Sequence, residues 1–268
     1  MGTGIAQIAA QNDFQVTLVD RTEADLERAM QRIQNNLFKL FQMEKISESQ
    51  MKRTLDNIYT TTDLQKSKYC DFAIEAVPEK LAIKQEIFRQ LDILMPESAI
   101  LASNTSSLSL AAIGSVTNRP DRVAGMHFFS PVPKMKLVEI VRSVNTSEET
   151  LQVIRDIGER MQKQIILAND YPGFTVNRVL VPMLNEAAFL VMEGNKVEEI
   201  DKGMMLGANH PVGPLKLSDY VGIDVLLFTL ESLYEGFNDS KYRPCPLLKR
   251  MVEAGHLGKK SGKGFYKY

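Results

Sequence analysis

Two periods of hydrophobic and polar residues divide the first part of the chain into helices and strands. Apolar residues recur at helical spacing after Asp20, where Leu26, Met30 and Ile33 begin a stripe within residues 22–47. Short apolar runs, which are typical of buried strands, lie at residues 14–20, 58–62, 70–77, 99–104, 122–129, 134–141 and 162–169. Helical segments separate most of these runs, so the pattern predicts a mostly parallel sheet with helices on both faces.

The pattern changes at the tripeptide Tyr171-Pro172-Gly173. Beyond it only helical periodicity is present, in residues 175–193, 197–206, 215–237 and 246–255. Proline and glycine interrupt regular structure, and their position between two kinds of pattern favours a domain boundary. We therefore expect an α/β domain over residues 1–170 and an all-helical domain over residues 171–268.

Composition and charge exclude several classes of partner. Lysine and arginine number 32 against 33 aspartate and glutamate, a net charge of -1, which favours neither nucleic acid nor an anionic membrane as the main partner. Cys70 and Cys245 lie far apart without metal-like spacing, and we expect reduced thiols and no metal site. No signal-peptide pattern and no membrane-length apolar run occurs, so we expect a cytoplasmic protein.

The first twenty residues have the pattern of the second half of a dinucleotide-binding βαβ unit. Gly2 precedes a helical pattern and fits the third glycine of G-x-G-x-x-G, whose glycines let a pyrophosphate approach the helix N-terminus. Asp20 ends the following strand-like run, where an acid binds the ribose 2′-hydroxyl and favours NAD over NADP. Capping of the next helix is the alternative role for Asp20. Together these features predict a Rossmann-like, doubly wound fold.

The pattern also indicates that this fold is incomplete within the sequence. The first strand and the first two glycines of the phosphate loop would precede Met1. We interpret the chain as truncated at its N-terminus, or less readily as a natural variant that lost the strand. In either case we expect folding with weakened NAD binding, because backbone N–H groups that contact the pyrophosphate would be missing.

A histidine and a glutamate are candidates for acid–base chemistry. His127 ends a strand-like run, the prolines Pro131 and Pro133 predict a reversal of the chain, and Glu139 lies on the returning run. Such a hairpin can bring the carboxylate beside the imidazole, where it would fix the tautomer and raise the basicity. Oxidation of an alcohol requires a base for the hydroxyl proton. A structural role is the alternative for a lone histidine at a strand end.

Several motifs, in order and across both predicted domains, resemble one enzyme family. They are SNTSSL (103–108), GMHFFSPVPKMKLVEIV (125–141), DYPGFTVNR (170–178), DYVGID (219–224) and GKKSGKGFYKY (258–268). The chain is similar along its whole length to the 3-hydroxyacyl-CoA dehydrogenases, and most to the short bacterial 3-hydroxybutyryl-CoA dehydrogenases. The resemblance implies reversible NAD-dependent oxidation of a short-chain L-3-hydroxyacyl-CoA to the 3-ketoacyl-CoA.

The resemblance also assigns roles to individual residues. His127 would be the catalytic base and Glu139 its orienting partner, while Ser106 and Asn177 would hydrogen-bond the reacting oxygen of the substrate. The residues implied on the cofactor side are Gly2, Asp20, Glu79, Lys84, Asn104, Ser106, Ser130 and Lys260. Without the resemblance, Glu79 and Lys84 would be interpreted as a solvated first helical turn. Positions that contact CoA in relatives are Asn36 and Met43 here, with Lys39 and Lys45 nearby as alternatives.

Two other functions stay open at this stage. One is a dehydrogenase of a free hydroxy acid or sugar acid on the same scaffold. The other is a catalytically impaired or structural member of the family, comparable to the lens crystallins recruited from it. The helical domain has more apolar helical surface than a small domain can bury, notably in residues 179–192 and 225–237, which predicts a homodimer.

Overall fold

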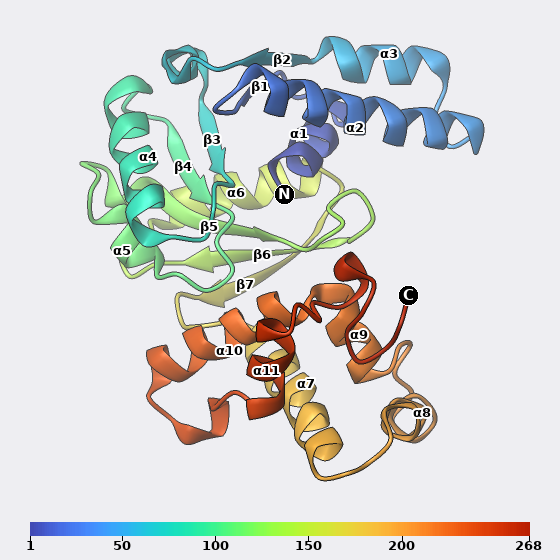
Figure 1. Cartoon of the computed structure of the whole chain (residues 1–268). Coiled ribbons are helices and arrows are strands. Elements are labelled where there is room, and N and C mark those ends of the chain that lie inside the picture. The colour runs from blue at the N-terminus through green and yellow to red at the C-terminus, as the bar shows by residue number, and fades with distance from the viewer. The chain divides into compact units, whose positions relative to one another are not determined.

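The computed structural model describes residues 1–268 and divides into two compact units, residues 1–170 and 171–268 (Figure 1). The elements of the first unit are α1 (Gly2–Gln11), β1 (Val16–Val19), α2 (Glu23–Gln42), α3 (Glu48–Asp56), β2 (Ile58–Thr61), β3 (Phe72–Glu75), α4 (Leu81–Leu94), β4 (Ile100–Ser103), α5 (Leu110–Gly114), β5 (Val123–Phe128), β6 (Leu137–Arg142), α6 (Glu148–Arg160) and β7 (Gln164–Asn169). The prediction of a mostly parallel α/β sheet followed by a helical unit is confirmed.

The strands of the first unit form two sheets. β1 and β2 pair in parallel, and β3 to β7 form a five-stranded sheet in chain order. Every neighbouring pair is parallel except β5 and β6, which are antiparallel. No strand of residues 1–268 joins β1 to β3. The interpretation of a truncated N-terminus stays a prediction.

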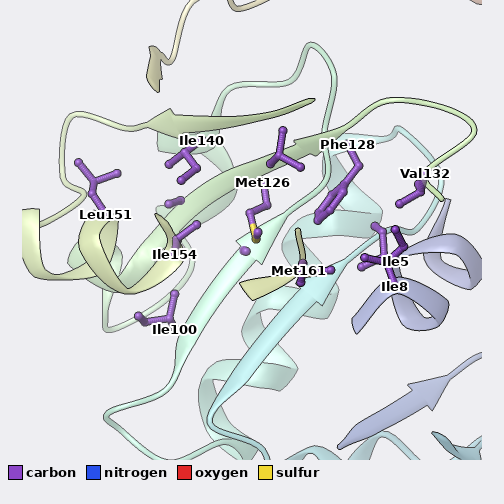
Figure 2. Close-up of a cluster of buried hydrophobic side chains, with 13 residues drawn as sticks. Ile5, Ile8, Ile100, Met126, Phe128, Val132, Ile140, Leu151, Ile154 and Met161 are labelled. Atoms are coloured by element: carbon purple, nitrogen blue, oxygen red, sulfur yellow. The ribbon is translucent and has the colours of Figure 1, made fainter. Parts of the chain in front are cut away.

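The core of the five-stranded sheet follows from the alternation of side chains along its strands. Met126 and Phe128 of β5 and Ile140 of β6 face a buried cluster that also contains Ile5 of α1 and Ile154 of α6 (Figure 2). Because successive side chains of a strand point to opposite faces, the residues between them lie on the other face of the sheet. That face includes Gly125, where an added Cβ would lie 2.9 Å from Leu110 of α5.

The long helix α2 forms where the apolar stripe predicts it. The Thr22 side chain accepts a hydrogen bond from the Asp25 backbone N–H (3.1 Å) and caps the helix start. Leu26, Ile33 and Leu37 are buried along one side, which is the spacing that gives a helix a single apolar face.

The second unit is entirely helical. It contains α7 (Val176–Met192), α8 (Val197–Gly207), α9 (Pro214–Val221), α10 (Ile223–Phe237) and α11 (Pro246–Glu253). Residues 215–237, which periodicity predicts as one segment, form two helices because Gly222 adopts a φ of 103° between them. A helix requires negative φ, so only the tertiary structure locates this break.

Buried carboxylates fix the C-terminal segment of the second unit. Asp219 accepts hydrogen bonds from the backbone N–H groups of Phe265 and Tyr266, both at 2.9 Å. The Tyr266 hydroxyl donates to Asp201 (2.8 Å). A Cβ on Gly264 would lie 1.9 Å from an Asp219 oxygen, so the segment requires glycine there. None of the helices has the length and apolar character needed to cross a membrane.

Candidate active site

The antiparallel pairing of β5 and β6 places His127 opposite Glu139. The register pairs these two residues directly, and directly opposed residues of antiparallel strands have neighbouring side chains. Both lie on the face of the sheet away from Met126 and Ile140, so both belong to the same face as Gly125. Strand register and side-chain alternation together therefore build the pair that the sequence motif suggests.

The contact between the two side chains is short and buried. His127 Nδ1 and Glu139 Oε2 are 2.7 Å apart, and the Glu139 side chain is 0% exposed. The ring of His127 also contacts that of Phe129, with centroids 4.5 Å apart. A carboxylate that accepts a hydrogen bond from Nδ1–H selects the neutral tautomer with its lone pair on Nε2. It also stabilises the imidazolium once a proton is taken up.

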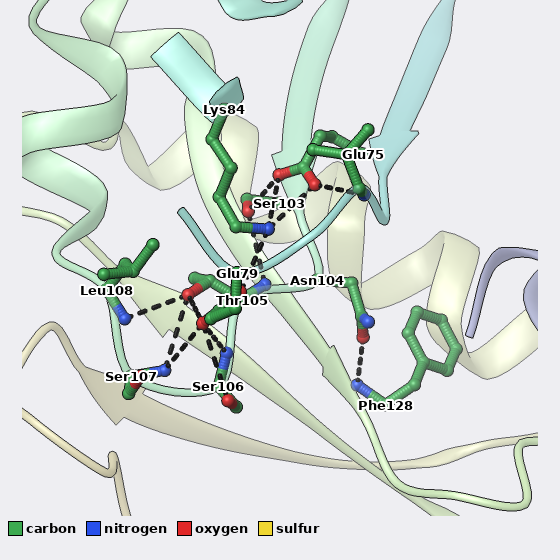
Figure 3. Close-up of polar contacts among 11 residues, drawn as sticks. Glu75, Glu79, Lys84, Ser103, Asn104, Thr105, Ser106, Ser107, Leu108 and Phe128 are labelled. Carbon is green, nitrogen blue, oxygen red and sulfur yellow. Dashed lines mark hydrogen bonds and ion pairs between the residues drawn. The ribbon is translucent and has the colours of Figure 1, made fainter. Parts of the chain in front are cut away.

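Residues after β4 lie at the same edge of the sheet and include two predicted site residues. Asn104 Oδ1 accepts a hydrogen bond from the Phe128 N–H (2.9 Å), next to His127, and the Asn104 N–H donates to the Glu75 carbonyl (2.8 Å) (Figure 3). Asn104 thus connects the ends of β3, β4 and β5. Ser106 follows in a short loop, where its backbone N–H donates to Glu79 Oε1 (2.9 Å).

Glu79 and Lys84, both predicted on the cofactor side, contact each other. Glu79 Oε2 lies 3.1 Å from Lys84 Nζ, and Oε1 accepts a hydrogen bond from the Thr105 hydroxyl at 2.5 Å. Burial by itself would raise the pKa of Glu79, but the Lys84 ammonium and the hydrogen bonds from Thr105 and Ser106 outweigh it and hold the pKa below its ordinary value. Lys84 is 1% exposed and also bonds Glu75.

The start of α1 and the end of β1 have two of the features found in dinucleotide-binding units. No side chain caps the N-terminus of α1 and its first turn carries no acid, so its N–H groups and dipole suit a pyrophosphate. A Cβ on Gly2 would lie 3.6 Å from Ala76, just after β3, so the helix starts at the carboxyl end of the strands. Asp20 is exposed directly after β1, where it can bind a ribose.

Four further predicted residues are divided between the two units, two in each. Ser130 is exposed in the loop after β5, and Lys39 is exposed in the last turn of α2. Asn177 lies in the first turn of α7, in the second unit. Lys260, in the same unit, forms an ion pair with Asp224 at 2.6 Å. No group of three or more His, Cys, Asp or Glu side chains is arranged to bind a metal ion.

The sequence interpretation did not single out Glu75 and Ser103. Both are buried at the ends of neighbouring strands, and the Ser103 hydroxyl donates to Glu75 Oε2 at 2.6 Å (Figure 3). The available signal was an acid at the end of the apolar run 70–77. A charged residue inside a buried strand is rare unless it is paired. The sequence could therefore have indicated that Glu75 has a partner, but not that the partner is Lys84, nine residues further along the chain.

Both units match known family domains. Residues 1–171 match "3-hydroxyacyl-CoA dehydrogenase, NAD binding domain", and residues 173–268 match "3-hydroxyacyl-CoA dehydrogenase, C-terminal domain". A protein of Bacillus subtilis named probable 3-hydroxybutyryl-CoA dehydrogenase is 48% identical over 100% of this chain and 94% of its own length. The mitochondrial hydroxyacyl-coenzyme A dehydrogenase of Sus scrofa is 41% identical over 100% of this chain and 88% of its own length.

Solved structures agree with the sequence relatives. The crystal structure of (S)-3-hydroxybutyryl-CoA dehydrogenase from Ralstonia eutropha superposes with a TM-score of 0.96 at 43% identity, covering 100% of this chain and 95% of that one. The family resemblance, the NAD cofactor and the oxidoreductase class expected from the sequence are thereby confirmed. The chain belongs to the 3-hydroxyacyl-CoA dehydrogenase family of NAD-dependent oxidoreductases.

Proposed function

We propose that the protein oxidises a short-chain L-3-hydroxyacyl-CoA, such as 3-hydroxybutyryl-CoA, to the 3-ketoacyl-CoA, and that the reaction is reversible. The observation that carries this proposal is the buried His127–Glu139 pair at the carboxyl edge of an NAD-binding sheet. The names of the relatives support the acyl-CoA substrate. NAD, when bound, supplies a hydride acceptor for the carbon that bears the hydroxyl.

The side chains of the protein control the proton and the reacting oxygen. His127 accepts the hydroxyl proton on Nε2, and Glu139 stabilises the resulting imidazolium through Nδ1. Ser106 and Asn177 donate hydrogen bonds to the substrate oxygen, which hold it in position and stabilise the charge that develops on it. In the reverse direction His127 returns the proton to the forming alkoxide. Lys39, an exposed residue of α2, is proposed to contact the CoA moiety.

Turnover with several substrates tests this function. A His127→Gln variant should oxidise NADH with acetoacetyl-CoA about 10²–10⁴-fold more slowly than the wild type, because a positioned base is lost. Binding of NADH should be unchanged. Activity above half of the wild-type value would refute the role of His127. If the wild type turns over free 3-hydroxy acids or sugar acids faster than acyl-CoA substrates, the alternative substrate class is favoured. If it binds NADH but shows no turnover, a structural role is favoured.

We further propose that the second unit, residues 171–268, mediates formation of a homodimer. Large apolar side chains are exposed on its helices, among them Val179 of α7 (73%) and Val225 and Phe228 of α10. Exposed apolar surface of this kind is typical of protein interfaces. Light scattering should give twice the chain mass of 30.1 kDa, and a monomer at micromolar concentration would refute the proposal. We also propose a cytoplasmic location, which the free thiols of Cys70 and Cys245 support.

A further inference from the structure

A buried cluster of charges lies behind the loop that carries Ser106. Lys84 Nζ is 2.8 Å and 3.0 Å from the two carboxylate oxygens of Glu75 and 3.1 Å from Glu79 Oε2 (Figure 3). The Lys84 and Glu75 side chains are 1% and 0% exposed. An ammonium and carboxylates removed from water require compensating contacts, and the cluster supplies these internally.

One end of this cluster is fixed by the sheet. Glu75 is the last residue of β3, and its carboxylate accepts hydrogen bonds from the Val77 N–H (2.6 Å) and from the hydroxyl of Ser103, the last residue of β4 (2.6 Å). Backbone pairing of β3 with β4 places Glu75 directly opposite Ser103. Glu75 therefore provides a rigid anchor for the Lys84 ammonium, which comes from α4.

The other end of the cluster contacts the loop between β4 and α5. Glu79 Oε1 accepts hydrogen bonds from the Thr105 hydroxyl (2.5 Å) and from the N–H groups of Ser106 (2.9 Å) and Ser107 (3.3 Å). The Thr105 hydroxyl oxygen in turn accepts from the Leu108 N–H (3.0 Å). The backbone of residues 105–108 has no helical or strand pairing, so these bonds to Glu79 and Thr105 define its conformation.

We propose that Lys84 is a positioning residue for the substrate-binding loop: held by Glu75, its ammonium fixes Glu79, and Glu79 fixes residues 105–108 and thereby Ser106. This inference rests on the proposed function, in which Ser106 binds the reacting oxygen. It gives Lys84 a role different from direct contact with the cofactor. It also explains why Glu79 is ionised in a largely buried place, since the ammonium and the loop donors stabilise the charged form.

Simple packing is the competing role for the cluster, and charge-balanced variants separate the two. Lys84→Met leaves Glu75 buried without its cation and can fail to fold. The double variant Glu75→Gln/Lys84→Met removes one charge of each sign, and such replacements of a buried ion pair are often tolerated. Glu79→Ala keeps the Lys84–Glu75 pair and removes the carboxylate that bonds both Lys84 and the loop. Lys80→Met is the matched control, because Lys80 is exposed and is not one of the residues that form the hydrogen bonds and ion pairs of the cluster.

Amide hydrogen exchange of the free enzyme measures the loop independently of activity. In the double variant and in Glu79→Ala, exchange at residues 106–108 should rise about tenfold or more, while the β5–β6 amides keep their wild-type rates. Steady-state kinetics with acetoacetyl-CoA should show kcat about 10²-fold lower, the loss typical of a misplaced catalytic contact. In the double variant the acid limb of the pH profile should also move to higher pH, because Glu79 lacks the ammonium that favours its ionised form.

The outcomes separate this inference from the proposed function. Wild-type exchange at residues 106–108 in both the double variant and Glu79→Ala would overturn the inference. Faster exchange with unchanged kcat in these two variants would also overturn the inference, provided that Ser106→Ala lowers kcat. A Ser106→Ala variant with wild-type kcat would refute the role of Ser106 in the proposed function, while the exchange measurement still decides whether Lys84 positions the loop.

Discussion

A Glu139→Gln substitution keeps the size and shape of the side chain and removes only its charge. In the native protein the carboxylate is 0% exposed and lies 2.7 Å from His127 Nδ1, in register across β5 and β6. The replacement amide is neutral. It can present either its carbonyl oxygen or its NH₂ group to the imidazole, and the NH₂ group would select the tautomer with the proton on Nε2.

The expected loss of activity follows from this contact. A hydrogen bond between charged partners contributes about 1.5–3 kcal/mol. When the imidazolium forms during oxidation, the variant lacks that stabilisation, and this corresponds to a factor of roughly 10–150 in kcat/KM. Selection of the wrong tautomer would move the effect toward the upper end of the range. The fold should be retained, because the amide fills the same volume.

The assay is the initial rate of NADH oxidation with acetoacetyl-CoA and of the reverse reaction with 3-hydroxybutyryl-CoA. Glu159→Gln is the control, because this substitution makes the same chemical change at an exposed position on α6 of the same unit. Thermal unfolding of both variants checks the fold. A Glu139→Gln enzyme with kcat/KM within twofold of the control would refute the argument that this carboxylate supports His127.

Three further predictions concern stability. Ile154→Ala, at a position 0% exposed in the cluster of Figure 2, should lower the free energy of unfolding by about 2–5 kcal/mol in urea denaturation. Gly264→Ala should displace the C-terminal segment from Asp219 and make residues after 258 sensitive to limited proteolysis, whereas a resistant segment would contradict the contact. Because the pKa of Glu79 is below its ordinary value of 4.5, its ionisation stabilises the fold above that pH, and the benefit disappears as the pH falls through the lowered pKa. The stability difference between wild type and Glu79→Gln should therefore be constant near neutrality and decrease in acid. A stability difference that does not change with pH would refute this account of Glu79.

The sequence by itself determined the order and type of the elements, because periodicity is a local property. The apolar stripe after Asp20 predicts α2, and the change of pattern at Tyr171 coincides with the boundary between the two units. The motif around His127 and Glu139 also indicates a strand, a turn and a returning strand. These features depend on residues close together in the chain, which is why they can be recognised without the fold.

The tertiary structure decided which side chains meet. A slip of one residue between β5 and β6 would move Glu139 to the opposite face, so their contact depends on register rather than on spacing. Lys84, interpreted from the sequence as part of a solvated helical turn or a cofactor contact, is buried against Glu75, the last residue of β3. Burial and partner choice result from contacts between distant segments, and for that reason local patterns could not predict them.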